Sequence, residues 1–376
     1  MTTAAKAALV SSIVAAIIVG GACALIAGQG DPSTLTPVVA ASMAPRATGT
    51  ASPGVLPLLD RAALASRGFG YRGLAMVTVW SSTGTRSALL DVVHLPGQGT
   101  SIWAHGTATN PATQLFNSAG VLGPADAPDV VLAQLARNYN LETVGVENVA
   151  GRSSQVISVS QPDGAQVARL WLDAQSGLLL RRETFDDSGR VLTASVFLSL
   201  TLTGTGADGG KGAHDLGSKA AAADTWGRRL PKLELARLRA QGWPCPQSVA
   251  GGLDLVLARE GTASATDTDP VSHLIYSDGL ATVSVFVQRG TLDATEMPTW
   301  QATTTQSRAI LEDPGPPDRW VWAGSGYVFT LVSDAGPQVN ETVLTALPGE
   351  RPAPDGVVPR LGRGVRKVLS WLNPFS

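Results

Sequence analysis

Residues 166–203 carry the pattern that most constrains the fold, because they predict three antiparallel strands joined by two short turns. In the last strand apolar residues recur at every second position over about twelve residues, which is typical of a strand with one buried face. The turns at residues 173–177 and 186–189 contain aspartate, serine and glycine, which favour reversal of the backbone. Such a meander predicts a curved sheet suited to binding. We expect one face of the last strand to carry Leu192, Ala194, Val196, Leu198, Leu200 and Leu202.

The rest of the chain predicts an α+β fold that is mostly antiparallel, because helices and strands do not alternate strictly. Ahead of the meander we expect helices at residues 58–67 and 126–138, and strands at 74–80, 88–95, 101–105 and 155–160. After it we expect a helix at residues 232–241 and strands at 253–259, 273–276, 281–288, 319–323 and 327–333. A short final helix is expected to begin at Asn340, an N-cap residue type, with Glu341 in its first turn.

Composition divides the 376 residues into two folded domains and several connecting segments. Residues 204–226 are rich in glycine and alanine without apolar periodicity, which is typical of a linker. The predicted order is a cytoplasmic tip at 1–6, an apolar segment at 7–28, a flexible stalk at 29–56, a first domain at 57–203, the linker at 204–226, a second domain at 227–346 and a basic tail at 347–376.

Residues 7–28 follow Lys6 and carry no charge. As a helix, an apolar segment of this length can cross a bilayer core of about 30 Å. Two interpretations stay open. The segment is either an uncleaved single-pass anchor in the cytoplasmic membrane or a signal segment that is removed after export. In both cases Lys6 favours an N-terminus on the inner side, with the bulk of the chain extracytoplasmic.

Charge argues against a nucleic-acid partner. Residues 351–376 carry five Lys or Arg and one acid, a net charge of +4, so the chain's total of −2 leaves −6 on the remainder. A nucleic-acid protein would carry its positive charge on the folded binding face. The tail also contains Trp371 and Phe375, a combination typical of docking to a membrane surface or an acidic partner, with ordinary packing as the alternative.

No catalytic or metal-binding set is visible in the sequence, so we expect no enzyme, no cofactor and no metal. Residues 68–73 match G-x-G-x-x-G but follow a predicted helix and open a strand, the reverse of a dinucleotide site. The histidines lack ligand spacing, and no serine lies in a G-x-S-x-G elbow. Cys245, the one cysteine outside residues 7–28, is expected to be a small buried residue.

Several short motifs resemble the MucB/RseB family of extracytoplasmic sigma-factor regulators. The resemblance covers residues 58–203 well and residues 227–346 more loosely. It is carried by Tyr71-Arg72-Gly73, Tyr139, Val149-Ala150-Gly151-Arg152, Arg169-Leu170-Trp171-Leu172-Asp173, Ser176-Gly177-Leu178-Leu179-Leu180-Arg181, the turn exit at 189–192, and Val271-Ser272-His273-Leu274-Ile275-Tyr276-Ser277-Asp278-Gly279-Leu280.

This resemblance implies a first domain like the lipoprotein carriers LolA and LolB, an unclosed β-barrel with helices, followed by a smaller α+β domain. It also implies a negative regulator of a sigma-E-type factor that binds the extracytoplasmic domain of a membrane-spanning anti-sigma factor and protects it from proteolysis. A lipid-like ligand would release that grip. The chain departs from the family pattern at both ends, through the expected anchor and the basic tail. A lipid or lipoprotein carrier of the cell envelope is the alternative.

Strand placement and apolar character alone give the candidate site residues. For an acyl ligand we expect contacts from Leu74, Met76, Trp103, Leu170, Leu172 and Phe197. For the protein partner we expect contacts from Val283, Val285, Trp320 and Trp322. The sequence alone does not decide which face of these strands is buried, because a shift of one residue exchanges the two faces.

Overall fold

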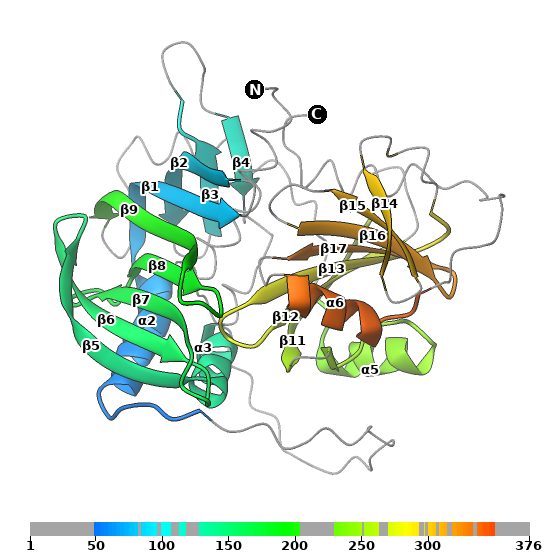
Figure 1. The fold of residues 1–376 in the computed structure, drawn as a ribbon, viewed down its shortest axis with the longest axis horizontal. Coiled ribbons are helices and arrows are strands. Elements are labelled where there is room, and N and C mark those ends of the chain that lie inside the picture. Colours follow the sequence, from blue (N-terminus) through cyan, green and yellow to red (C-terminus); the bar gives the residue numbers. More distant parts are fainter. Residues whose placement is uncertain are drawn as a thin grey trace.

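A computed structural model shows two antiparallel sheets, each with its own helices (Figure 1). Antiparallel pairing links every pair of neighbouring strands in both sheets, which confirms the predicted α+β, mostly antiparallel fold. The structure describes residues 49–81, 84–95, 99–106, 113–117, 128–203, 229–249, 252–262, 270–292, 297, 300–305, 308–313, 318–333 and 337–349.

The first sheet has nine strands in the order β4-β3-β2-β1-β9-β8-β7-β6-β5. It is unclosed, because β4 and β5 form its two edges and do not pair with each other. Its strands are β1 (Gly70–Ser81), β2 (Gly84–Leu95), β3 (Gly99–Ala104), β4 (Thr113–Asn117), β5 (Asn140–Val149), β6 (Arg152–Ser160), β7 (Gln166–Asp173), β8 (Leu179–Phe185) and β9 (Val191–Thr203).

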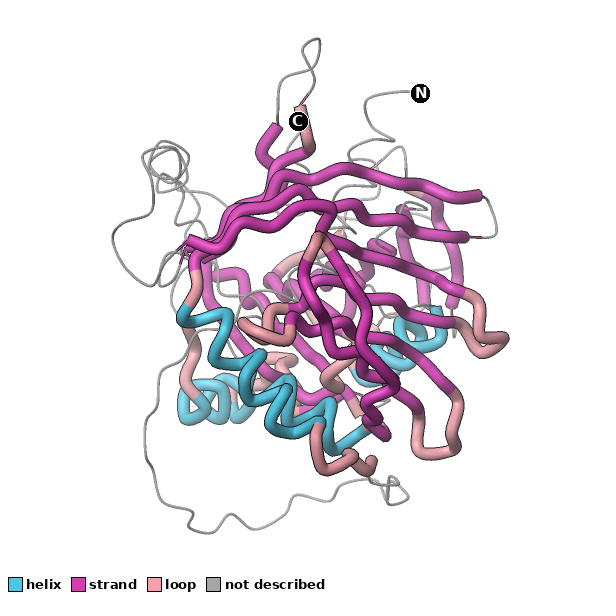
Figure 2. The backbone as a smooth tube through the Cα atoms, turned by 90° about the vertical axis from the view of Figure 1, so that its left-hand side faces the viewer, coloured by secondary structure: helices cyan, strands magenta, loops and turns pink. Residues whose placement is uncertain are grey.

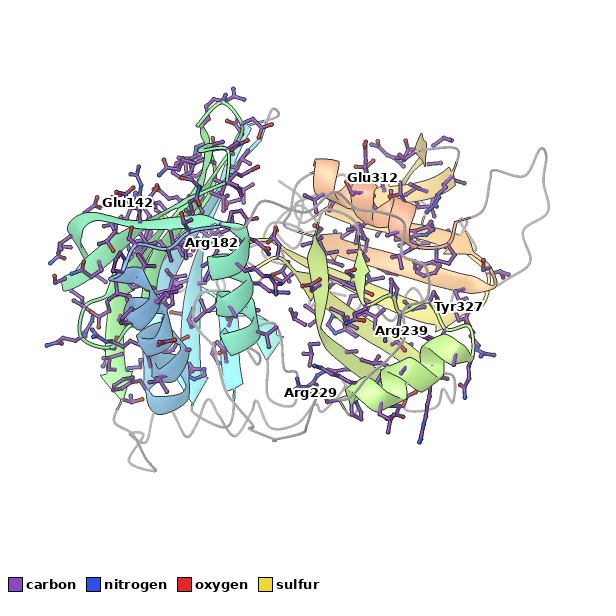
Figure 3. The ribbon with its side chains drawn as sticks, turned by 90° about the horizontal axis from the view of Figure 1, so that it is seen from below. Glu142, Arg182, Arg229, Arg239, Glu312 and Tyr327 are labelled. Atoms are coloured by element: carbon purple, nitrogen blue, oxygen red, sulfur yellow. The ribbon has the colours of Figure 1, made fainter. Side chains whose placement is uncertain are left out.

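Two helices cover this sheet, α2 (Val55–Gly68) and α3 (Pro128–Asn138). Leu59 of α2 and Leu135 of α3 pack with Ile157 and Leu170 from the strands in one buried cluster. The sheet curves past α2, and α3 lies on the side nearest the second sheet (Figures 1 and 3). From the side, the strands run next to one another and bend together, with a helix along the lower edge (Figure 2).

The second sheet has eight strands in the order β10-β11-β12-β13-β17-β16-β15-β14. Its core includes Val285, Trp322 and Phe329, covered by Leu235 of α5 (Lys232–Ala240) and Leu344 of α6 (Pro337–Ala346). Its strands are β10 (Ser248–Val249), β11 (Leu253–Thr262), β12 (Pro270–Ser277), β13 (Thr282–Arg289), β14 (Gln301–Thr305), β15 (Arg308–Asp313), β16 (Asp318–Gly324) and β17 (Tyr327–Ser333).

A bulge in β9 overturns the prediction that its alternating apolar residues all share one face. Leu74 of β1 pairs with Ser199 and Ala75 pairs with Phe197, so Leu198 is an extra residue. Because an inserted residue shifts the alternation, Phe197 is buried while Leu198 stays 46% exposed. Odd-numbered residues of β9 therefore face the core before the bulge, and even-numbered residues face it after the bulge.

Several boundaries also differ from the expected ones. The predicted α6 start at Asn340 is wrong, since the helix begins at Pro337 and Asn340 lies buried inside it. Proline suits a first helical turn because its missing N–H would have no intrahelical partner there. The strands β4, β5, β10, β14 and β15 were not expected. The order of α2 before β1 is confirmed at Gly68–Gly70, so the glycines there shape a helix-to-strand turn.

Several predicted segments lie outside the described residues. These are the apolar segment at 7–28, residues 29–48 of the stalk, the linker at 204–226 and the tail beyond residue 349. Within the described residues, no helix is both long enough and apolar enough to span a bilayer. The domain boundaries, the anchor and the role of the tail stay predictions.

Candidate functional site

The turn between β12 and β13, Ser277–Ala281, is held in shape by its own side chains. Asp278 Oδ1 accepts hydrogen bonds from the backbone N–H of Leu280 at 2.9 Å and of Ala281 at 2.8 Å. Ser277 Oγ accepts from the N–H of Gly279 at 3.0 Å and donates to the Ala281 carbonyl at 2.8 Å. Aspartate and serine satisfy the turn backbone locally, so the turn projects from the second sheet in one defined conformation.

This turn reaches the first sheet and touches the backbone of α3. A Cβ atom built on Gly279 would lie 2.1 Å from the Leu135 nitrogen and 2.5 Å from its Cα. Gly279 also has a φ of 102°, a conformation that side chains disfavour. Glycine is therefore required here twice, once for the turn and once for the close approach of two backbones.

Polar groups from the end of α3 and from β8 bind the turn directly. Tyr139 Oη donates to Asp278 Oδ2 at 2.6 Å, and Asn138 Nδ2 donates to the Asp278 carbonyl at 2.7 Å. Arg182 of β8 donates to the Leu280 carbonyl at 2.7 Å. Arg182 and Asn138 are both buried, so these bonds form away from water, where a lost partner is costly. Figure 3 shows Arg182 on the part of the first sheet near α3.

We call the contact between the turn Ser277–Ala281 and the first sheet with its helix α3 the junction. An apolar contact completes it. Leu280 is 8% exposed and belongs to the core cluster of the first sheet, together with Leu135, Leu170 and Leu172. A side chain carried by the second sheet is thus part of the core of the first. Nearby, Val131 of α3 packs with Val256, Leu257 and Ile275 of the second sheet.

At the rim of the junction the side chains are more exposed, and their polar contacts contribute less to stability. Asp254 accepts a hydrogen bond from Arg137 at 2.9 Å and from Gln134 at 3.2 Å. The Arg137 and Asp254 side chains are 56% and 44% exposed, so water screens this ion pair. The junction therefore depends on the buried turn and not on the rim.

The predicted acyl-contact residues do not form one site. Leu170 and Leu172 lie in the cluster that receives Leu280, whereas Phe197 lies in the neighbouring cluster with Ala75 and Val77. The others are half-buried on the opposite face of their strands. Since paired residues share a face, Leu74, Asp91 and Trp103 form one row there, and Met76 lies beside it opposite Leu89.

The predicted partner-contact residues are all in the core of the second sheet. Val283, Val285 and Trp322 are fully buried and Trp320 is 7% exposed. Trp322 also donates its indole N–H to the Pro348 carbonyl at 2.9 Å. In this conformation these side chains have no surface to offer a partner, because α5 and α6 cover them.

The residues of the junction turn were not among the site residues predicted from strand placement. Its motif, Ser277-Asp278-Gly279-Leu280, carried part of the family resemblance but was assigned no role. The usable signal is an apolar leucine inside an otherwise polar turn. A turn at the surface would leave that leucine in water, so its presence indicates a second surface against which it packs.

Cys245 is 1% exposed, which confirms the expected buried cysteine, and burial raises the pKa of its thiol. A buried thiol with a raised pKa is a poor nucleophile at neutral pH. Across the described ranges, no three side chains of histidine, cysteine, aspartate and glutamate are grouped to hold a metal ion.

Comparison with known proteins gives matches over both sheets. Residues 108–224 match the MucB/RseB N-terminal domain model. The chain is 25% identical over 284 residues to the Sigma-E factor regulatory protein RseB of Salmonella typhimurium, covering 69% of this chain and 83% of that protein. It is 30% identical over 157 residues to the Sigma factor AlgU regulatory protein MucB of Pseudomonas aeruginosa, covering 42% and 46%.

A solved structure of MucB in complex with MucA(peri) aligns with 79% of this chain and 99% of its own, at 21% identity and a TM-score of 0.39. The family model and both sequence relatives point to the same family as the motifs quoted above. They confirm that this chain resembles the MucB/RseB family of sigma-factor regulatory proteins, with its N-terminal domain match at residues 108–224.

Proposed function

We propose that this chain is a non-enzymatic negative regulator of a sigma-E-type factor, acting by binding the extracytoplasmic domain of an anti-sigma factor. The observation that carries the proposal is its similarity to RseB, a Sigma-E factor regulatory protein, across 83% of the length of that relative. MucB, which also matches in sequence, has been solved in complex with MucA(peri). Binding would protect the anti-sigma factor from proteolysis and so keep the sigma factor inactive.

The proposed location is the outer face of the cytoplasmic membrane. Residues 7–28 would serve as a single-pass anchor or as a segment removed on export, and the described residues would be extracytoplasmic. Anchoring would raise the local concentration of the chain near a membrane-spanning partner, which strengthens binding without new contacts.

The junction between the sheets suggests how a ligand would control the partner. Leu280 fills part of the cluster formed by Leu170 and Leu172, so an acyl chain that enters this cluster would compete with Leu280. Ligand binding would then weaken the junction and change the arrangement of the two sheets. A partner that binds one arrangement better would be released, since a ligand shifts a conformational equilibrium by its differential affinity.

Crosslinking of the full, tagged chain in intact cells of its own host tests the regulatory role. Recovery of a single-span anti-sigma factor, together with faster degradation of that factor when the chain is deleted, is the expected result. If the anti-sigma factor is stable without the chain and does not crosslink to it, the proposal is wrong.

A carrier of lipids or lipoproteins is the second candidate function. The apolar cluster around Leu170 and Leu172 favours it, because the same residues would hold an acyl chain in either role. Native mass spectrometry of the chain purified from its host separates the two. A bound lipid without any protein partner favours the carrier, whereas a stoichiometric anti-sigma fragment favours the regulator.

A further inference from the structure

The outer edge of β5 is exposed over most of its length. Every residue from Glu142 to Asn148 is exposed, whereas Leu141 and Val149 at the ends are buried. Val144 is 51% exposed and Val146 is 60% exposed, so apolar side chains face water on this edge strand. Figure 3 shows Glu142 at the margin of the molecule, on the side away from the second sheet.

The beginning of this edge already holds another segment of the chain. Residues 49–52 run beside it, with a parallel bridge between Ala51 and Leu141. The Leu141 N–H donates to the Thr50 carbonyl at 2.8 Å, and the Ser52 N–H donates to the Leu141 carbonyl at 2.9 Å. The chain then enters α2 at Val55, so this pairing stops where the exposed part of β5 begins.

Backbone geometry identifies which N–H and carbonyl groups of β5 are available to pair with a further strand. Leu141 directs its N–H and carbonyl away from β6, so Thr143, two residues later, directs its own the same way. The register shift between Thr143 and Gly145 marks a bulge at Val144, after which Val146 and Asn148 face outward. Among the described residues, no segment pairs with these three backbone positions.

The side chains indicate what would fit. Glu142 and Glu147 carry negative charge along the strand, and Glu147 also accepts the Trp171 indole N–H at 2.8 Å. The exposed valines lie between them. A second copy of β5 would bring like charges together, which disfavours edge-to-edge pairing of two chains. An extended segment with lysine or arginine and β-branched residues would instead match both the charges and the valines.

We propose that the open edge of β5, residues 142–148, is a docking site for an extended, positively charged segment of another protein, which adds to the first sheet as a further strand. Main-chain hydrogen bonds to Thr143, Val146 and Asn148 would give affinity, and the glutamates would select basic partners. This site lies on an outer edge of the first sheet, and it does not depend on the proposed role in sigma-factor control.

A pair of variants at one position tests the proposal. In Val146→Pro the outward N–H is lost, while pairing with β6 is kept because proline is tolerated where its nitrogen faces solvent. Val146→Thr keeps the N–H and the β-branched shape. The probe is a fluorescent nine-residue peptide of alternating lysine and valine, with glutamate in place of lysine as its control, added to the full chain.

We expect Val146→Pro to weaken binding of the lysine peptide at least about tenfold and Val146→Thr to change it less than about twofold. Glu142→Lys should weaken binding by a similar factor without a change in fold, and added salt should weaken binding to the unsubstituted chain. Hydrogen exchange should show new protection confined to residues 141–149.

Three outcomes would overturn the proposal. One is equal binding of the lysine peptide by the proline and threonine variants, when circular dichroism shows that both are folded. Another is equal binding of the glutamate and lysine peptides by the unsubstituted chain. The third is a concentration-dependent dimer in sedimentation that Val146→Pro abolishes, which would make a second copy of the chain the occupant. If the proline variant does not fold, the Glu142→Lys result and the exchange data decide.

Discussion

Asp173 shows at the scale of one residue how a turn is fixed. Burial of Asp173 opposes its ionisation, but hydrogen bonds from Arg152 and Ser176 outweigh that effect and hold its pKa below the ordinary 3.8. Arg152 Nε donates to Asp173 Oδ1 at 3.0 Å, and Ser176 Oγ donates to Asp173 Oδ2 at 2.5 Å. The carboxylate thereby joins the start of β6 to the turn after β7.

Asp173→Asn should therefore lower the free energy of unfolding by about 2–4 kcal/mol at pH 7, because it leaves Arg152 without its charged partner. Because the folded pKa is depressed, the contribution of Asp173 is complete above pH 3.8 and is lost as the pH falls below it. Urea unfolding measures both effects. Asp187→Asn, at an exposed position of the turn before β9, is the control and should cost less; equal losses would contradict the account.

His273 gives a second prediction at this scale. Burial, and then the nearby Arg259 charge, lower its pKa from 6.5 to about 3. The unfolded chain therefore takes up a proton near pH 6.5 that the folded chain does not, so stability falls as the pH drops from 6.5. The slope approaches about 1.4 kcal/mol per pH unit. His273→Phe, which keeps an aromatic ring against Phe286, should flatten this slope between pH 6.5 and 4.5 in thermal unfolding; an unchanged slope would exclude His273 as its source.

At the scale of elements, the β12–β13 turn and α3 depend on one glycine. Gly279→Ala places a methyl group against the α3 backbone, whereas Gly164→Ala, in the β6–β7 turn, meets nothing within 4 Å. Both glycines have positive φ, 102° and 97°, so both substitutions share a backbone cost of about 1–2 kcal/mol. Only Gly279→Ala should also increase hydrogen exchange in α3. Equal exchange in the two variants would mean that the turn does not press on α3.

At the scale of the whole molecule, the two sheets have separate cores joined by one buried contact region. Leu280→Asp would place a charge in the first core, which is costly without a partner. We expect this variant to show two calorimetric transitions and a larger radius of gyration, because each sheet keeps its own core. Leu233→Asp, at a position 67% exposed on α5, should behave like the unsubstituted chain. A single transition in both variants would show that the sheets are coupled by other contacts.

Much of the fold could be predicted from local pattern. The strands of the meander and the helices α3 and α5 follow directly from periodicity and turn residues. β5 was not expected, because an edge strand exposed on both faces shows no alternation of buried and exposed positions. The β9 bulge was missed for a related reason, since an inserted residue leaves the alternation of residue types intact while it exchanges their faces.

The sequence by itself determined the fold class, the resemblance to the MucB/RseB family and the burial of Cys245, because local periodicity and residue chemistry suffice for these. Only the tertiary structure decided that Leu170 and Leu172 share a core with Leu280, and that Val283, Val285, Trp320 and Trp322 are enclosed beneath helices. Which face of a strand meets which neighbour depends on register, bulges and long-range packing. These are properties of pairs of segments far apart in the chain, and no local pattern specifies them.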